Sequence, residues 1–303
     1  MPARSSQPLE ALSAEDVARY ERDGYIVMER RLPADIIVAC KAELARFHDE
    51  ARGLSESNDR LDLEDSHTPG DPRVRRVKLP HTQSKVMADL MVSDLILAPV
   101  RDLVGPNLRL HTSKLNVKSA RYGAMVDFHQ DFAFYPHTND DLLAVGVMLD
   151  DVDEENGPLL VFPGSHRGPI FDHHHNGVFA GTMDLEACGL RLEDAVSLKA
   201  PAGSISIHHA RIVHGSAPNR SPRDRGVIFY EMMAADAFPI LGSMTTAPSL
   251  EDYDQRMLCG APTKEPRLTE VPVRVPQPQP AANRSIYEVQ KAAAKKGFAP
   301  AAE

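Results

Sequence analysis

Four polar residues between positions 129 and 225 have the types and spacing of an iron site. His129 and Asp131 are separated by one residue, His214 follows 85 positions after His129, and Arg225 lies 11 residues further on. Two imidazoles and one carboxylate can occupy one face of an Fe(II) ion, which leaves the opposite positions open for a bidentate keto acid and O2. An arginine can hold the far carboxylate of that keto acid through a bidentate pair. The pattern therefore predicts a non-haem iron centre that uses a keto acid.

The spacing of His129 and Asp131 also predicts the structure around them. Residues i and i+2 of a β-strand point to the same face, so these two side chains converge on a strand while Gln130 faces away. Short apolar segments separated by turn residues surround the polar residues, which is typical of a β-sandwich or barrel. The expected strands cover residues 108–115, 127–132, 142–149, 159–162, 204–207, 212–214 and 226–232.

The chain before residue 108 is expected to be mainly helical. Ser13 can cap a helix with carboxylates in its first turn. A second helix starts near Pro33, and residues 86–103 carry an apolar stripe at helical spacing. The polar segment 55–71 is expected to be a mobile loop. We interpret residues 1–12 as a tail, residues 13–260 as one domain and residues 261–303 as a Pro-rich extension with a short final helix.

Composition argues against several classes of protein. The 303 residues carry a net charge of −9, which argues against a nucleic-acid partner. Cys40, Cys188 and Cys259 are widely spaced and odd in number, so neither a disulfide framework nor a cysteine-based zinc site is expected. No apolar run reaches the roughly 18 residues of a membrane span, and the N-terminus lacks the apolar stretch of a secretory signal. We therefore expect a cytoplasmic protein whose partner is a small molecule; the oligomeric state is not indicated.

Several motifs together resemble the phytanoyl-CoA dioxygenase family of Fe(II)/2-oxoglutarate-dependent oxygenases. The resemblance covers about residues 12 to 240, and the rest of the chain matches nothing we can name. The matching segments are Arg22-Asp23-Gly24-Tyr25-Ile26-Val27, His129-Gln130-Asp131, Asn156-Gly157-Pro158-Leu159, Pro163-Gly164-Ser165-His166, Ala202-Gly203-Ser204, and His214-Gly215-Ser216-Ala217-Pro218-Asn219 with Arg225.

The resemblance implies a mainly β fold, namely a double-stranded β-helix (a cupin-like jelly roll) with flanking α-helices. It implies that His129, Asp131 and His214 ligate Fe(II). It also implies that Arg225 and Ser216 bind the distal carboxylate of 2-oxoglutarate. Ser216 lies two positions after His214, so on a strand both face the same cavity. The implied reaction consumes 2-oxoglutarate and O2, releases succinate and CO2, and hydroxylates or otherwise oxidises the substrate without catalytic side chains beyond the metal centre.

Other residues leave two interpretations open. Lys114 and Asn116 share one face of a strand that in the family lines the 2-oxoglutarate site, but that face can equally be a solvated surface. The basic run at 73–78 can attract an anionic organic substrate or lie on a solvated face, and the aromatic residues after the iron motif can wall the substrate pocket or pack in the core. The residues considered for the substrate site are Arg75, Arg76, Lys78, Phe134 and Tyr135.

Two runs of adjacent histidines lie outside the iron pattern. His173, His174 and His175 are adjacent and cannot all face one ion, so we expect a loop rather than a second metal site. One of His208 and His209 can border the active site, or both can be structural.

The sequence leaves two alternative functions open: a cupin-like metal enzyme that does not use 2-oxoglutarate, and a non-catalytic binding protein on the same fold.

Overall fold

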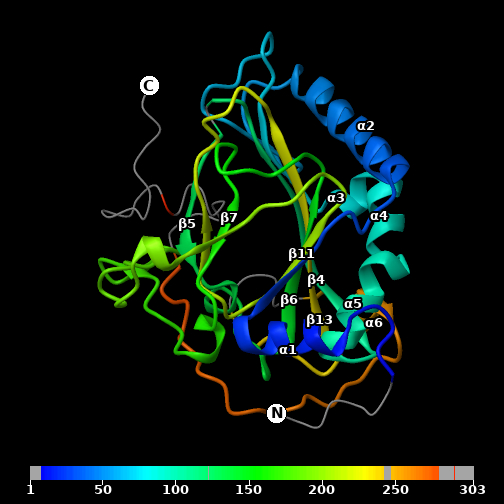
Figure 1. Cartoon of the computed structure of the whole chain (residues 1–303), viewed down its shortest axis with the longest axis vertical. Coiled ribbons are helices and arrows are strands. Elements are labelled where there is room, and N and C mark those ends of the chain that lie inside the picture. Colours follow the sequence, from blue (N-terminus) through cyan, green and yellow to red (C-terminus); the bar gives the residue numbers. More distant parts are fainter. Residues whose placement is uncertain (1–7, 122, 242–246, 280–289, 291–303) are drawn as a thin grey trace.

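The core of the molecule consists of two β-sheets, as seen in a computed structural model that describes residues 8–121, 123–241, 247–279 and 290 (Figure 1). The strands of the major sheet are β1 (Tyr25–Met28), β2 (Leu61–Leu63), β3 (Val74–Lys78), β4 (Leu108–Lys118), β6 (Leu142–Met148), β11 (Ile205–His209), β13 (Arg225–Ala234) and β14 (Met257–Cys259). The strands of the minor sheet are β5 (Val126–His129), β7 (Leu159–Val161), β10 (Val196–Leu198) and β12 (His214–Ser216). A separate pair is formed by β8 (His174–His175) and β9 (Val178–Phe179).

Strand order places sequence-distant segments side by side. The major sheet has the order β1-β11-β6-β13-β4-β3-β2, with β14 paired to β4, and the minor sheet has the order β10-β7-β12-β5. The pairings within both sheets are antiparallel. This arrangement is a jelly roll, and it confirms the mainly β fold expected from the sequence.

Helices cover the outer face of the major sheet (Figure 1). Ser13 caps the first helix as expected, because its side chain accepts from the Asp16 backbone N–H while the Asp16 carboxylate accepts from the Ser13 backbone N–H. The helices are α1 (Ala14–Asp23), α2 (Ala34–Ala51), α3 (Pro80–Gln83), α4 (Lys85–Met91), α5 (Asp94–Val104) and α6 (Leu250–Asp254), with short 3₁₀ turns η1 (Asp131–Ala133), η2 (Ser165–Arg167) and η3 (Leu192–Asp194).

Alternation along β13 separates the core from the cavity. Ile228 and Tyr230 point outward and pack in the helix-covered core, where the Tyr230 hydroxyl donates to the Met87 carbonyl at 2.8 Å. Val227 and Phe229 point to the opposite face and line a cavity between the two sheets. The same strand therefore stabilises the fold with one set of side chains and shapes the site with the other.

Several sequence predictions need correction. The strand expected at 127–132 ends at His129, because Asp131 starts the 3₁₀ turn η1. The single helix expected at 86–103 is two helices, α4 and α5, separated near Ser93. The loop expected at 55–71 contains β2, which pairs with the basic segment β3. The final helix lies outside the described residues, apart from Gln290. Among the described residues, no helix combines the length and apolar character that crossing a membrane requires.

Candidate active site

The predicted triad is assembled by the pairing of β5 with β12. His129 and His214 are direct cross-strand partners, and their ring centroids lie 4.2 Å apart. The Asp131 carboxylate is 3.6 Å from His129 Nε2 and 3.9 Å from His214 Nε2. One ligand atom from each of the three buried residues lies within 4.8 Å of the other two. Two histidines and one carboxylate at these distances fit the donor set of a non-haem Fe(II) site.

Both histidines are held in the orientation that a metal ligand needs. His129 Nδ1 lies 2.8 Å from the Asp127 carbonyl, and His214 Nδ1 lies 3.0 Å from the Ile212 carbonyl. Because a carbonyl oxygen can only accept, each Nδ1 carries the proton and each Nε2 keeps a lone pair. Such backbone contacts fix the tautomer and the ring orientation of metal-ligating histidines.

Electrostatics favour the charge states that bind a cation. Burial, together with the neighbouring His129 ring, holds the pKa of His214 well below its usual value, so its imidazole is neutral. Burial alone would raise the pKa of the Asp131 carboxyl, but the His214 ring and the Lys114 ammonium hold it well below its usual range. The site therefore presents the neutral imidazole of His214 and the carboxylate of Asp131, beside the His129 ring whose Nδ1 is bonded to the Asp127 carbonyl.

Gln130 faces away from the triad, as expected, and anchors the motif. Its amide nitrogen donates to the Pro169 carbonyl at 3.1 Å and to the Arg211 carbonyl at 2.8 Å, while its amide oxygen accepts from the Phe171 N–H at 2.9 Å. Its own backbone N–H donates to His173 Nε2 at 3.0 Å. The residue between the two metal-facing side chains is thus bonded through both its side chain and its backbone.

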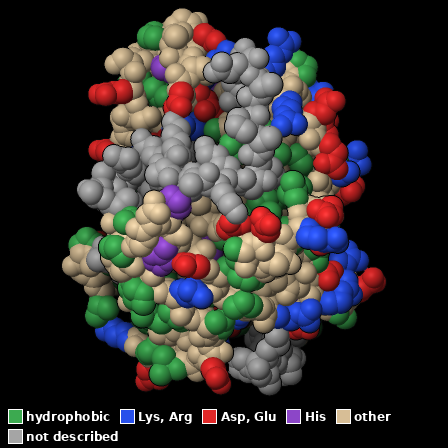
Figure 2. Space-filling model, turned by 90° about the vertical axis from the view of Figure 1, so that its left-hand side faces the viewer, with side chains coloured by type: hydrophobic (Ala, Val, Ile, Leu, Met, Phe, Trp, Pro, Cys, Tyr) green, Lys and Arg blue, Asp and Glu red, His purple; other side chains and the backbone are tan. Residues whose placement is uncertain are grey.

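The histidine run at 173–175 supports the motif, and His174 and His175 form strand β8 where a loop was expected. His173 is buried and neutral, because burial lowers its pKa to about 4 and Nε2 accepts from Gln130. His174 instead contacts Asp172 and the Gln277 carbonyl. Figure 2 looks onto the side where the minor sheet lies, and histidine side chains reach the surface there, in agreement with the partial exposure of His174 and His175.

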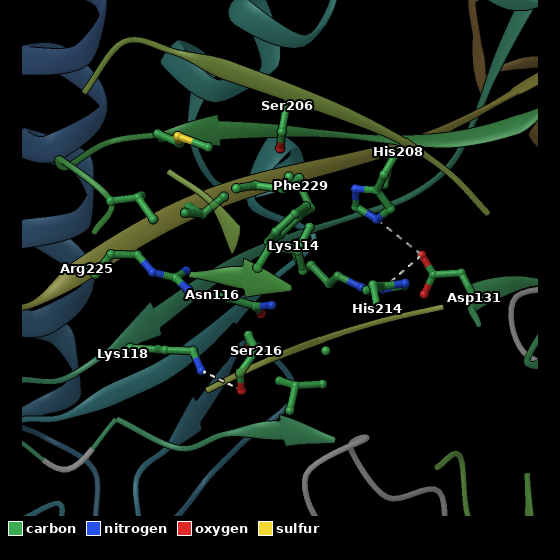
Figure 3. A pocket seen from close by; sticks show the side chains of 18 of the residues that line it. Lys114, Asn116, Lys118, Asp131, Ser206, His208, His214, Ser216, Arg225 and Phe229 are labelled. Carbon is green, nitrogen blue, oxygen red and sulfur yellow. Dashed lines mark hydrogen bonds and ion pairs between the residues drawn. The ribbon is translucent and has the colours of Figure 1, made fainter. Parts of the chain in front are cut away.

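A cavity of about 60 Å³ runs from the triad between the two sheets (Figure 3). The major sheet contributes side chains from β3, β4, β6, β11 and β13, and the minor sheet contributes β5, β7, β10 and β12. The polar lining residues are Arg76, Lys114, Asn116, Lys118, His129, Asp131, Ser206, His208, His214, Ser216 and Arg225. Four of these are cationic, whereas Asp131 is the one carboxylate among the described lining residues.

Two buried cations, Arg225 and Lys118, mark the end of the cavity away from the triad (Figure 3). They are cross-strand partners on β13 and β4. Arg225 donates to the Gly157 carbonyl, and Lys118 donates to the carbonyls of Ala217 and Ser216. Burial and the Arg225 charge lower the pKa of Lys118 well below its usual value. The positive charges of these two paired residues repel each other, so a bound anion between them would be favourable.

Lys114 lies at the triad end of the cavity. It forms a 2.6 Å ion pair with Glu231, whose other carboxylate oxygen accepts from the Tyr135 hydroxyl at 2.9 Å. Burial would lower the pKa of Lys114, but Glu231 and Asp131 raise it above its usual value. Asn116 lies between Lys114 and Lys118 on the same strand face and accepts from Arg76 Nε at 3.1 Å. The face of β4 that the sequence left undecided is therefore the cavity face.

The other predicted substrate residues are not brought together at the cavity lining. Arg75 is buried and lies 4.0 Å from the Glu64 carboxylate, and Lys78 pairs with Asp62 at 2.8 Å. Phe134 packs edge-on against His129, with ring centroids 5.6 Å apart. Tyr135 is buried behind the triad, bonded to Glu231. Of the basic run, Arg76 is the residue that lines the cavity.

Sequence reasoning missed Lys118 in the cavity and left the choice between His208 and His209 open. Lys118 was overlooked, although its spacing of two from Asn116 is a signal for the same strand face. His208 lies on β11 with Nε2 3.8 Å from the Asp131 carboxylate, whereas His209 packs on the other side of the strand beside Asp140. No local pattern distinguishes these two histidines, since either face of β11 can be buried.

The fold and the site together define a jelly-roll oxygenase with a two-histidine, one-carboxylate metal centre. Residues 20–227 match the model of the family described as phytanoyl-CoA dioxygenase (PhyH), and the chain belongs to this family. It is a non-haem dioxygenase that uses Fe(II), 2-oxoglutarate and O2.

Relatives and solved structures agree with this assignment. The chain is 34% identical over 289 residues to a "Probable alpha-ketoglutarate-dependent hypophosphite dioxygenase" of Stutzerimonas stutzeri, covering 94% of this chain and 99% of that protein. It is 29% identical over 237 residues to an ectoine dioxygenase of Bordetella parapertussis, covering 73% and 75%. The crystal structure of EctD from S. alaskensis with 2-oxoglutarate and 5-hydroxyectoine matches with a TM-score of 0.66 and 25% identity, covering 90% of this chain and 93% of that one.

Proposed function

We propose that His129, Asp131 and His214 ligate the iron, and that Arg225, Ser216 and Lys118 bind the distal carboxylate of 2-oxoglutarate. The convergence of the three ligand atoms within 4.8 Å carries the first assignment. The pair of buried cations at the opposite end of the cavity supports the second, because a carboxylate there would offset their repulsion. Asn116, between the two ends, is assigned to the wall of the 2-oxoglutarate site.

Iron, when bound, supplies the oxidising chemistry by activating O2 at the expense of 2-oxoglutarate, which leaves as succinate and CO2. The protein positions the reactants. The backbone carbonyls of Asp127 and Ile212 orient the imidazoles of His129 and His214, and the bonds of Gln130 fix the chain between His129 and Asp131. The apolar lining residues, among them Met148, Leu198 and Phe229, keep water from the reacting centre.

Lys118 gives the binding of 2-oxoglutarate a predicted pH dependence. Its pKa is lowered in the free enzyme, and a bound dianion would raise it, so binding takes up a proton once the pH exceeds the lowered pKa. The affinity for 2-oxoglutarate should therefore fall as the pH rises from the lowered pKa of Lys118 in the free enzyme towards its raised pKa in the complex. The dissociation constant should be measured against pH for the unaltered enzyme and for Lys118→Met. The variant should bind more weakly and with a flatter profile; parallel profiles would exclude this role for Lys118.

We further propose that the prime substrate is a small oxyanion of phosphorus, with hypophosphite as the first candidate. The cavity lining carries four cations against one carboxylate, and one pair of cations is assigned to 2-oxoglutarate. Arg76 and Lys114 also line the cavity and add positive charge that would attract a second anion, although Glu231 offsets part of the Lys114 charge. The alignment of a relative named for hypophosphite over 94% of this chain supports the same choice. This proposal keeps the anionic substrate expected from the sequence but replaces the expected organic compound with an inorganic one.

The proposed reaction inserts one oxygen atom of O2 into a P–H bond of hypophosphite, which gives phosphite. The other oxygen atom enters succinate, and the keto acid loses CO2. The test is a comparison of hypophosphite, ectoine and L-proline for stimulated succinate release, with phosphite followed by phosphorus NMR. Hypophosphite should give equal amounts of succinate and phosphite. Stimulation by ectoine or L-proline, without any by hypophosphite, would contradict the substrate assignment and leave the dioxygenase assignment intact.

Arg76→Gln should separate the substrate from the co-substrate. Losing one contact between a charged donor and an oxyanion costs roughly 1.5–3 kcal/mol, which corresponds to a rise of about tenfold or more in the KM for hypophosphite. The KM for 2-oxoglutarate should stay within about threefold. The matched control is Arg73→Gln, because Arg73 belongs to the same basic run but pairs with Asp71 outside the cavity. A selective rise for 2-oxoglutarate would instead assign Arg76 to the co-substrate.

A further inference from the structure

The strand that carries His129 lies at the edge of its sheet. In the order β10-β7-β12-β5, β5 has a strand neighbour on one side, among the described residues. An edge strand presents backbone N–H and C=O groups that need other partners. The conformation of this edge strand affects the metal centre, because the Asp127 carbonyl orients the His129 ring.

A side chain from the far end of the sequence pairs with this edge. Gln290 is 4% exposed, and its amide oxygen accepts from the Asp127 N–H at 3.0 Å. Its amide nitrogen donates to the Gly181 carbonyl at 2.7 Å and to the Asp127 carbonyl at 3.4 Å. A glutamine amide has an acceptor and donors in the arrangement of a peptide group, so Gln290 replaces the backbone of a neighbouring strand.

The two interactions meet at one atom. The Asp127 carbonyl oxygen accepts from His129 Nδ1 at 2.8 Å and from Gln290 Nε2. Gln290 also connects the Asp127 peptide to the Gly181 carbonyl. Two residues after Gly181, the Met183 N–H donates to the Phe128 carbonyl of β5 at 3.0 Å. Any shift of the Asp127 peptide would change the direction of the His129 ring and therefore the position of its Nε2.

The preceding part of the C-terminal extension is attached to the same region. Arg274 donates to the Ile170 carbonyl at 2.8 Å, and the Pro278 carbonyl accepts from the Phe179 N–H at 2.9 Å. Ile170 and Phe179 enclose a segment that includes His173, whose Nε2 accepts from the Gln130 backbone N–H. The extension thus contacts the loop that supports the iron motif from its other side.

We propose that Gln290 is a positioning residue of the metal centre, through which the C-terminal extension completes the edge of the iron-carrying strand. The proposal rests on the assignment of His129 as an iron ligand. Gln290 has no contact with the metal or the substrate in this scheme, so its effect is transmitted through the Asp127 peptide to the His129 ring. The extension is accordingly a part of the catalytic unit and not a dispensable tail.

The experiment measures anaerobic Fe(II) affinity and the visible absorption of the enzyme with Fe(II) and 2-oxoglutarate, in full-length variants. Gln290→Ala should raise the Fe(II) dissociation constant about tenfold, because outer partners of metal ligands are typically worth 10–100-fold. Gln290→Glu should be at least as damaging, since it fills the same space but cannot donate to the two carbonyls. Gln279→Ala is the matched control, because its side chain bonds locally to the Pro276 carbonyl.

The outcomes distinguish a failure of the positioning role of Gln290 from a failure of the assignment of His129 as an iron ligand. If Gln290→Glu binds Fe(II) like the unaltered protein while Gln290→Ala does not, the residue fills space and the positioning role is wrong. If both variants lower the unfolding temperature but leave Fe(II) affinity and absorption unchanged, the contact is structural alone, and the proposal also fails. His129→Ala is run in parallel: loss of iron there with no effect at Gln290 contradicts this inference alone, whereas unchanged iron binding in His129→Ala contradicts the proposed function.

Discussion

Replacing His214 by alanine is expected to weaken Fe(II) binding by more than about 100-fold and to abolish turnover. Partners of metal ligands are themselves worth 10–100-fold in metal affinity, and loss of a direct ligand should exceed that range. His214 is held by the Ile212 carbonyl with its Nε2 directed at the Asp131 carboxylate, so its removal takes away an oriented donor of the triad. Anaerobic Fe(II) titration measures the effect without requiring a substrate.

His175→Ala is the appropriate control for that measurement. It removes an imidazole of the same type from a partly exposed strand, where its Nε2 contacts Asn176. Its Fe(II) affinity should match that of the unaltered protein. Unchanged affinity in His214→Ala would mean that the triad is not the iron site, and His208, 3.8 Å from the same carboxylate, would be the next residue to test.

Arg225→Gln is expected to raise the dissociation constant for 2-oxoglutarate by about thirtyfold or more. Truncating one partner of a buried, hydrogen-bonded charge pair costs roughly 2–5 kcal/mol, and about 1.4 kcal/mol corresponds to a factor of ten. Iron affinity should remain nearly unchanged, because Arg225 lies at the opposite end of the cavity from the triad (Figure 3). The measurement is a titration of the Fe(II)-loaded enzyme with 2-oxoglutarate in the absence of O2.

Arg223→Gln provides the comparison for Arg225. Arg223 is two residues away but exposed, and it pairs with Asp153 outside the cavity. Its removal should change 2-oxoglutarate binding by less than about twofold, since exposed ion pairs contribute 0–1 kcal/mol. A value within twofold of the unaltered enzyme for Arg225→Gln would show that another residue, with Lys118 as the first candidate, binds the carboxylate.

The convergence of His129 and Asp131 could be predicted from the sequence because it depends on local information, whereas His214 was recognised from its residue type and its motif. His129 and Asp131 are one residue apart, and the convergence of their side chains follows from backbone geometry over a single step of chain. The structure reaches the same convergence by another route, since the strand ends at His129 and Asp131 begins a 3₁₀ turn. The expected strand was wrong at its end, but the short spacing left little freedom for the two side chains to diverge.

The flanking helices show where local patterns are insufficient. The apolar stripe over residues 86–103 predicts one helix, but the chain forms α4 and α5, with Ser93 between them. Both helices bury the same stripe against the major sheet, so the periodicity of the apolar residues is almost the same in either arrangement. The break is decided by how the chain fits over the sheet, which depends on residues far away in sequence.

The sequence by itself predicted the jelly-roll class, the candidate iron ligands and Arg225, from the residue types of an iron site and from motifs that resemble the phytanoyl-CoA dioxygenase family. The tertiary structure alone decided which face of β4 lines the cavity, and it therefore added Lys118 and selected Arg76 from the basic run. It also brought Gln290 to Asp127 across 163 positions of chain. Tertiary packing and strand pairing bring such distant residues together. Their contacts leave no periodic signal in the sequence, because the local pattern of each segment is compatible with several placements.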